Sequence, residues 1–417
     1  MAAPTKYNET SSPKQFSVSV EMAVTTATAK GRVASRSGPL PYFLSDEQRQ
    51  IAATLERFLA ERAPIDGRRG ILSVGVGSDT HDLWQELGAL GVLGAPIPAE
   101  NGGLGGSTPE IGLVMEALGK YLVATPFVHS NILAASVLLA VNADLSLDSI
   151  VSGEEVLMPA LWEPGHRYEP RYVSARAVVQ PDGSYLVTGH KMTMFGGSGT
   201  EYLVSAREGQ GGGKGSDRTE HGITLFRVPA NSAGVTVSVG QNFDGSKVAE
   251  VKLDRVTVPN TQRLGPSEQA YDLIAPAVRL SILANCAEAV GAMQAMFERT
   301  LEYVKVRSQF GVALGSFQAI QHRLVDMFSA IETARANVRS GLARFGSWND
   351  SEQARYIAMV KLYTDQTSRL VMREAVQLHG GMGMTDELMI GHYFKRLLMI
   401  RLAFSSPQQQ LADSYPT

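Results

Sequence analysis

The chain has 417 residues, of which 44% are hydrophobic and 19% charged, and its formal net charge at pH 7 is −3. This composition is typical of a globular protein with more than one core, and it shows no basic excess that would suit nucleic acid. The single cysteine, Cys286, excludes an internal disulfide and a multi-cysteine metal site. It fits a reducing compartment, and its apolar surroundings favour a buried, inert thiol.

The first 43 residues are rich in Ser, Thr and Ala and hold few large apolar side chains. A segment of this kind cannot form a core, so we predict a disordered extension over residues 1–43. We expect the protein to be cytoplasmic. An organelle transit peptide is the alternative, which would place a eukaryotic protein in the mitochondrial matrix. No run of about 18 uncharged apolar residues occurs, so we expect no insertion into a membrane.

Helical periodicity begins at Ser45, which has an N-cap side chain and is followed three residues later by Gln48, as in a capping box. A loop rich in Gly and Pro interrupts the helical pattern over residues 91–106. We therefore predict an all-helical domain over residues 44–155, with further helices at 82–90, 110–122 and 131–140.

The middle of the chain changes to the alternating, β-branched pattern of strands, with turn signals such as Asp244 and Gly245 between them. This pattern predicts a small antiparallel β domain over residues 156–258. A Gly-rich loop over residues 209–221 lacks the spacing of a phosphate-binding loop. The expected strands cover residues 185–189, 202–206, 223–228, 235–239 and 249–253.

Long helical patterns return after the β region and predict a four-helix bundle over residues 259–417. The third helix should end at Gly380, a natural C-terminal stop. No βαβ alternation and no GxGxxG motif occurs, so a Rossmann nucleotide fold is not expected. The expected helices cover residues 271–306, 317–344, 352–379 and 386–404.

Residues 307–323 join the first two bundle helices and hold a guanidinium, flexible glycines and several side-chain amides. A guanidinium binds phosphate oxygens bidentately, so this set suits a large cofactor that carries a pyrophosphate. The segment resembles a signature of the acyl-CoA dehydrogenase flavoproteins, and residues 377–396 resemble another. The resemblance covers about residues 44–405 and implies FAD as the cofactor.

The resemblance also implies roles for individual residues. Arg307 would bind the FAD pyrophosphate, and Phe310 and Gln318 would contact its adenosine half. The same cofactor-binding set includes Gln309 and Phe317. In this family these groups reach across a subunit interface to FAD held mainly by the neighbouring chain. The simpler interpretation is that Arg307 only faces solvent at the end of a helix.

A second cofactor motif follows from the resemblance, because Gln377, Gly380 and Gly381 match a Gln-x-x-Gly-Gly pattern. Glycines at such positions let a cofactor approach a bare backbone. Taken without the resemblance, Gly380 and Gly381 could serve only as a helix cap. No pair of histidines has metal-ligand spacing, so we expect no metal.

The residues that should carry the chemistry of the family are missing. Its members remove an α-proton of an acyl thioester with a glutamate while hydride passes to the flavin, and the usual position of that glutamate is Phe404 here. Another family position falls near Ser281, which leaves Glu288 and Asp272 as candidates for a displaced base. Structural carboxylates are the simpler interpretation of both. Phe195 stands where the family has a hydroxyl that bonds the flavin ring, and phenylalanine cannot donate a hydrogen bond.

The cofactor motifs are present and the catalytic residues are missing, which suggests a chain that contacts FAD but does not itself perform the reaction. We expect the subunit without the catalytic base in a hetero-oligomeric acyl-CoA dehydrogenase, of the small-subunit type known for steroid side-chain thioesters. Its partners would be an acyl-CoA substrate, a sister subunit that carries the glutamate, and an electron-transfer protein. The alternatives are a homo-oligomeric enzyme with its base at Glu288 or Asp272, and a flavin-free scaffold.

Overall fold

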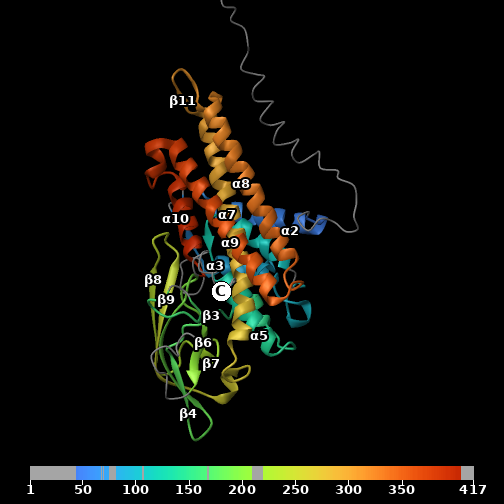
Figure 1. Cartoon of the computed structure of the whole chain (residues 1–417), viewed down its shortest axis with the longest axis vertical. Coiled ribbons are helices and arrows are strands. Elements are labelled where there is room, and N and C mark those ends of the chain that lie inside the picture. Colours follow the sequence, from blue (N-terminus) through green and yellow to red (C-terminus); the bar gives the residue numbers. More distant parts are fainter. Residues whose placement is uncertain are drawn as a thin grey trace, which may run out of the picture. The chain divides into compact units, whose positions relative to one another are not determined.

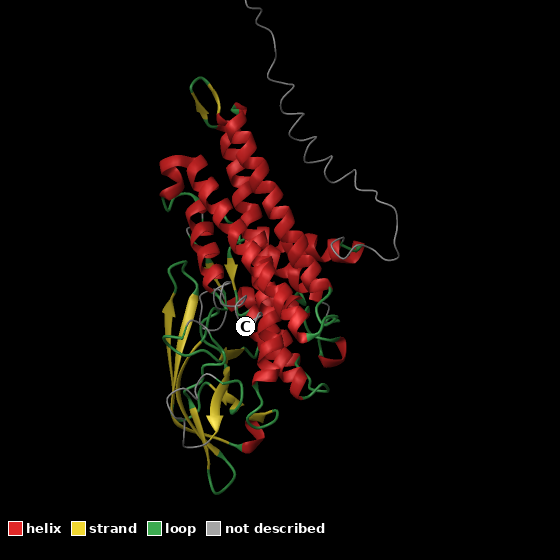
Figure 2. Cartoon of the chain, viewed as in Figure 1, coloured by secondary structure: helices red, strands yellow, loops and turns green. Residues whose placement is uncertain are grey.

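The computed structural model describes residues 44–66, 68, 70–74, 81–105, 108–166, 169–208 and 219–404. The extension predicted over residues 1–43 lies outside this range. Within it the chain forms a helical region, then a β region, then long helices (Figure 2). The predicted fold class, helical domain, β domain and helical bundle in that order, is confirmed.

The N-terminal region starts as predicted, because Ser45 and Gln48 form a reciprocal capping box on the first helix. It is not purely helical, since β1 (Leu72–Ser73) pairs in parallel with β2 (Val123–Ala124). The predicted helix at 131–140 begins instead as a π-helix, η3 (Val128–Ala134). The helices of the region are α2 (Asp46–Arg62), α3 (His81–Ala89), α4 (Thr108–Lys120), α5 (Ala135–Val141) and α6 (Asp148–Ser152).

One eight-stranded sheet forms the β region, in the order β10-β7-β6-β4-β5-β9-β8, with β3 paired to β6 off this path. All five predicted strands are present. The sheet is mixed rather than antiparallel, because β3 and β4 both run parallel to β6. The strands are β3 (Leu157–Ala160), β4 (Arg176–Val179), β5 (Tyr185–Met192), β6 (Glu201–Glu208), β7 (Ile223–Pro229), β8 (Val235–Gln241), β9 (Lys247–Val258) and β10 (Arg263–Leu264).

The last strand, β10, lies beyond the boundary that we predicted at residue 258 and is joined to β9 by a short 3-10 turn. Long helices follow and pack beside the sheet (Figure 1). The first matches its predicted bounds, and the others begin or end within three residues of theirs. They are α7 (Tyr271–Val306), α8 (Gln318–Ala343), α9 (Asp350–His379) and α10 (Met389–Leu402).

The centre of the bundle is α7, which packs against α4, α8, α9 and α10. By length and composition alone α7 could cross a membrane, but 78% of its most apolar window is buried inside the protein. Two glycines bring α7 close to α4. A Cβ at Gly119 would lie 2.1 Å from the carbonyl oxygen of Glu288, and one at Gly291 would lie 1.9 Å from that of Glu116. Only glycine permits this approach of two backbones.

Candidate functional site

Most of the predicted cofactor-binding residues lie at one end of the bundle. The chain leaves α7 through a short hairpin of β11 (Ser308–Gln309) and β12 (Val312–Ala313), and it leaves α9 through the 3-10 turn η7 (Gly380–Met384). We call residues 307–317 together with η7 the bundle tip. Figure 1 labels β11 at this end of the molecule.

The side chains of the hairpin project into solvent. Arg307 is the C-cap of α7, and among the described residues its side chain has no hydrogen-bond or ion-pair partner. Phe310 is 91% exposed, and its φ of 55° is unusual for a bulky residue. Its ring meets Phe317 edge-on, with the ring centroids 6.2 Å apart. An exposed guanidinium beside an aromatic pair suits the pyrophosphate and adenine of FAD.

The second motif is equally open. Gln377 lies exposed in the last turn of α9, and the helix stops at Gly380, whose φ is 62°. A Cβ built at Gly380 or at Gly381 would meet no atom within 4 Å. The backbone here therefore faces open space, as the approach of a cofactor requires. Gln309 and Gln318 are exposed at the hairpin as well.

The positions expected to hold the flavin ring and the base are closed. Phe404, at the usual position of the glutamate, is buried among His129, Trp162 and Phe195, and each of these four side chains is at most 3% exposed. The rings of His129 and Trp162 contact Phe404, with centroids 6.1 Å and 5.8 Å away. We call these four residues the aromatic cluster. Phe404 therefore has packed rings around it at the position where the resemblance places the glutamate.

Phe404 has a strained backbone as well as a buried ring. Its φ of 58° lies in the left-handed region, which a bulky side chain adopts rarely and at a cost of roughly 1–2 kcal/mol. The preceding helix is held by the buried ammonium of Lys361, which donates a 2.6 Å hydrogen bond to the carbonyl oxygen of Ile400. The packing of His129 and Trp162 on the Phe404 ring must offset this strain.

Next to this cluster a buried arginine neutralises one of the candidate bases. The guanidinium of Arg396 lies 2.6 Å from a carboxylate oxygen of Glu288 and 3.1 Å from one of Asp244. Burial alone would lower the pKa of Arg396, but the two carboxylates raise it above its usual value. We call these residues the ionic triad. Its arginine also lies over the ring of Phe195, 4.7 Å from the centroid.

The other candidate base lies elsewhere. Asp272 is exposed in the first turn of α7, far along the helix from Glu288. Ser281, the alternative family position, is buried and donates a 2.8 Å hydrogen bond to the carbonyl oxygen of Ala277. The structure thus places Glu288 beside the aromatic cluster, where Arg396 pairs with it, and it places Asp272 at the surface.

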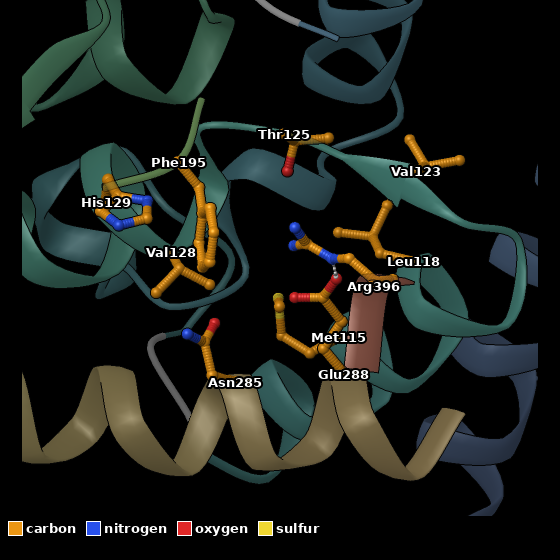
Figure 3. A pocket seen from close by; sticks show the side chains of 10 residues that line it. All are labelled: Met115, Leu118, Val123, Thr125, Val128, His129, Phe195, Asn285, Glu288 and Arg396. Carbon is orange, nitrogen blue, oxygen red and sulfur yellow. Dashed lines mark hydrogen bonds and ion pairs between the residues drawn. The ribbon is translucent and has the colours of Figure 1, made fainter. Parts of the chain in front are cut away.

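A small cavity lies between the aromatic cluster and the ionic triad (Figure 3). Its volume is ≈ 10 Å³, which is room for about one water molecule and far too little for a flavin ring or an acyl thioester. Asn285 of α7 lines it together with His129. Both amide atoms of Asn285 and both ring nitrogens of His129 are buried without a hydrogen-bond partner among the described residues.

His129 is neutral in this position. Burial and, to a smaller extent, the charge of Arg396 lower its pKa to about 3. A neutral imidazole fits an aromatic surrounding, in which an imidazolium would lose most of its hydration. The residues of this cleft therefore do not fit the reactive end of FAD, whereas the bundle tip fits its pyrophosphate and adenosine.

Sequence reasoning missed much of this arrangement. Arg396 is the last residue of the segment 377–396 that resembles a family signature, and the sequence indicated Asp244 only as part of a turn. His129 and Trp162 carried no signal of their own, since each reaches the cluster only through the fold. Arg396 lies in the middle of α10, and its burial beside two carboxylates is visible only in the structure.

Comparisons with known proteins agree with the fold. The family described as "Acyl-CoA dehydrogenase, C-terminal domain" matches residues 278–404, and "Acyl-CoA dehydrogenase, N-terminal domain" matches residues 45–145. The chain is 29% identical over 314 residues to "Probable acyl-CoA dehydrogenase YngJ" of Bacillus subtilis, which covers 73% of this chain and 80% of that protein.

Solved structures show the same architecture. Butyryl-CoA dehydrogenase from Megasphaera elsdenii superposes with a TM-score of 0.77 at 24% identity, over 88% of this chain and 97% of the other. The ChsE4-ChsE5 complex from Mycobacterium tuberculosis gives 0.72 at 23% identity, over 89% and 97%. The family that matches both ends of the chain implies FAD as the cofactor. The chain belongs to the acyl-CoA dehydrogenase family.

Proposed function

We propose that this chain is the subunit without a catalytic base in a hetero-oligomeric acyl-CoA dehydrogenase. The observation that carries the proposal is the burial of Phe404 in the aromatic cluster, at the position where the family has its glutamate. Removal of an α-proton from a thioester requires a carboxylate within hydrogen-bond reach of substrate. Phe404 is buried and offers no carboxylate.

The open bundle tip gives this chain its part in the reaction. Arg307, Phe310 and Gln318 would contact the pyrophosphate and adenosine of FAD whose flavin ring is held by a sister chain. Bound FAD supplies the hydride acceptor, and the sister chain supplies the glutamate and the acyl-CoA site. A solved relative named as a complex of two different chains supports such pairing. An electron-transfer protein would reoxidise the flavin, and one relative is named as a subunit of a caffeyl-CoA reductase-Etf complex.

The ionic triad argues against the homo-oligomeric alternative. Glu288 is held in a buried ion pair with Arg396, and moving its carboxylate to a substrate would leave the guanidinium with Asp244 alone. Separating one partner from a buried ion pair costs about 3–5 kcal/mol. Asp272 stands in water at the end of α7, where no dry site surrounds it.

The test is expression of this chain alone and together with a sister acyl-CoA dehydrogenase that retains the glutamate. The pair should bind FAD and bleach its visible absorbance on addition of acyl-CoA, while the chain alone should do neither. Replacing the sister's glutamate by glutamine should abolish bleaching, and Asp272→Asn in this chain should not. Reduction of flavin bound to this chain alone would overturn the proposal. A pair that assembles without any flavin absorbance would favour the scaffold.

A further inference from the structure

Two aromatic rings join the ends of the helices that carry the two cofactor motifs. The phenol ring of Tyr303, in the last turn of α7, stacks on the imidazole of His379, the last residue of α9. The ring centroids lie 4.3 Å apart, with an angle of 23° between the planes. His379 is buried and Tyr303 is half-buried. This stack is a direct side-chain contact between two helix ends that each lead into the bundle tip.

Each ring is one short step from a cofactor residue. The carbonyl oxygen of Tyr303 accepts a 2.9 Å hydrogen bond from the backbone N–H of Arg307, so the stack holds the turn from which that arginine leaves the helix. His379 immediately precedes Gly380. Movement of either ring would therefore move one of the two motifs relative to the other.

The imidazole is fixed on both sides. Its Nδ1 lies 2.8 Å from the carbonyl oxygen of Ala375, and a carbonyl only accepts, so Nδ1 carries the proton of the neutral ring. Burial lowers the pKa of His379, and the hydrogen bond to Ala375 opposes this in part. On the other side a Cβ at Gly383 would come within 3.0 Å of the Cβ of His379, so the η7 turn packs directly on this residue.

A second contact reinforces the first from α8. The guanidinium of Arg323 lies 3.0 Å from a carboxylate oxygen of Glu374, one turn before His379 on α9. Arg323 closes the segment 307–323, so this ion pair also ties the first cofactor motif to α9. Glu374 is buried whereas the side chain of Arg323 is 48% exposed, so the pair is partly screened by solvent and we assign it the smaller share.

We propose that Tyr303 and His379 are positioning residues, which hold Arg307 and the glycines Gly380 and Gly381 in the one relative arrangement that grips FAD. This inference rests on the proposed function, because it assumes that the bundle tip contacts FAD. Neither ring has to touch the cofactor. The energy of their contact is available to keep both motifs in place before the cofactor arrives, which reduces the entropy lost on binding.

The experiment measures the Kd for FAD of the co-expressed pair, after removal and re-addition of the cofactor, by flavin fluorescence. His379→Ala and Tyr303→Leu should each raise this Kd about two- to tenfold, the fold-change that corresponds to the energy of one aromatic pair. His379→Phe keeps a ring on Tyr303 and should recover most of the affinity. His190→Ala removes a half-buried histidine of β5, outside the bundle tip, and should leave the Kd unchanged.

Arg307→Met separates failure of this inference from failure of the proposed function. If Arg307→Met weakens FAD binding but His379→Ala and Tyr303→Leu bind as the wild type does, the positioning role is wrong and the cofactor contact stands. If Arg307→Met has no effect, the contact itself is wrong. The thermal midpoint of the FAD-free pair is the second readout. If His379→Ala and Tyr303→Leu lower the thermal midpoint but bind FAD as the wild type does, the stack contributes only to stability.

Discussion

The ring of Phe404 stacks on the imidazole of His129 with an angle of 13° between the planes. The two residues stand 275 positions apart in the chain, so only the fold brings them together. One ring belongs to the residue that stands where the resemblance places a catalytic glutamate, and the other to a buried histidine held neutral. Under the proposed function, the two rings belong to a packed core rather than to a binding site.

Phe404→Glu should fail to create a dehydrogenase and should destabilise the chain. The new carboxylate would stand in a buried cluster whose neighbouring cation, Arg396, is already paired with two carboxylates. We expect a loss of about 3–5 kcal/mol in the free energy of unfolding, from the lost ring and the unpaired charge. Denaturant unfolding measures it. Phe404→Leu should cost clearly less, and a fully stable Phe404→Glu chain would contradict the closed cleft.

Arg396→Met should leave Glu288 and Asp244 as two buried carboxylates without a counter-charge. Losing one partner of a buried ion pair costs about 3–5 kcal/mol, so the thermal midpoint should fall by several degrees. The matched control is Arg49→Met, which removes an exposed arginine that pairs with Asp46 at the surface. That change should have almost no effect. Equal behaviour of the two variants would show that the triad is not a buried network.

His129 should make the protein less stable as the pH falls. Its pKa is about 3 in the folded chain and near 6.5 when unfolded, so the unfolded state binds the additional proton between these values. The contribution is therefore complete above pH 6.5 and is lost progressively as the pH falls towards 3. The loss is at most about 1.4 kcal/mol for each pH unit.

The measurement compares unfolding of the wild type and His129→Leu at several pH values between 7 and 4. The free-energy difference between the two should shift in favour of the variant as the pH falls, because leucine takes up no proton. A constant difference between wild type and His129→Leu would mean that this imidazole is not buried neutral.

Gly291→Ala should force α4 and α7 apart. Its new methyl group would fall 1.9 Å from the carbonyl oxygen of Glu116, a backbone atom that cannot move aside. Overpacking of this kind costs typically about 1–3 kcal/mol and more where the backbone must shift. Gly240→Ala is the control, since its Cβ would lie 3.6 Å from the nearest atom on an exposed strand. Thermal unfolding should separate the two variants.

Local patterns predicted the parts of the fold that depend on neighbours in sequence. The bounds of α7 agree with its predicted range, and the capping box of Ser45 with Gln48 forms as expected. Helical periodicity and a cap are properties of adjacent residues, so they survive in any tertiary context that buries the same face.

Contacts between distant residues could not be predicted in this way. Asp244 and Arg396 stand 152 positions apart, and the parallel pairing of β3 and β4 with β6 depends on where the chain returns to the sheet. The resemblance led us to expect a glutamate where Phe404 stands. It could not predict that Phe404 packs against His129 and Trp162, because the packing of rings follows from the fold rather than from spacing.

The most direct test of the paired, non-catalytic subunit is the ratio of FAD to protein chains in the purified complex with its sister dehydrogenase. Flavin absorbance after denaturation, set against the amount of each chain, measures it. We expect one FAD for each pair of chains, and none bound by this chain when it is purified alone. Two FAD for each pair, one for every polypeptide, or FAD bound by this chain when it is purified alone, would contradict the account and return the reaction to this polypeptide.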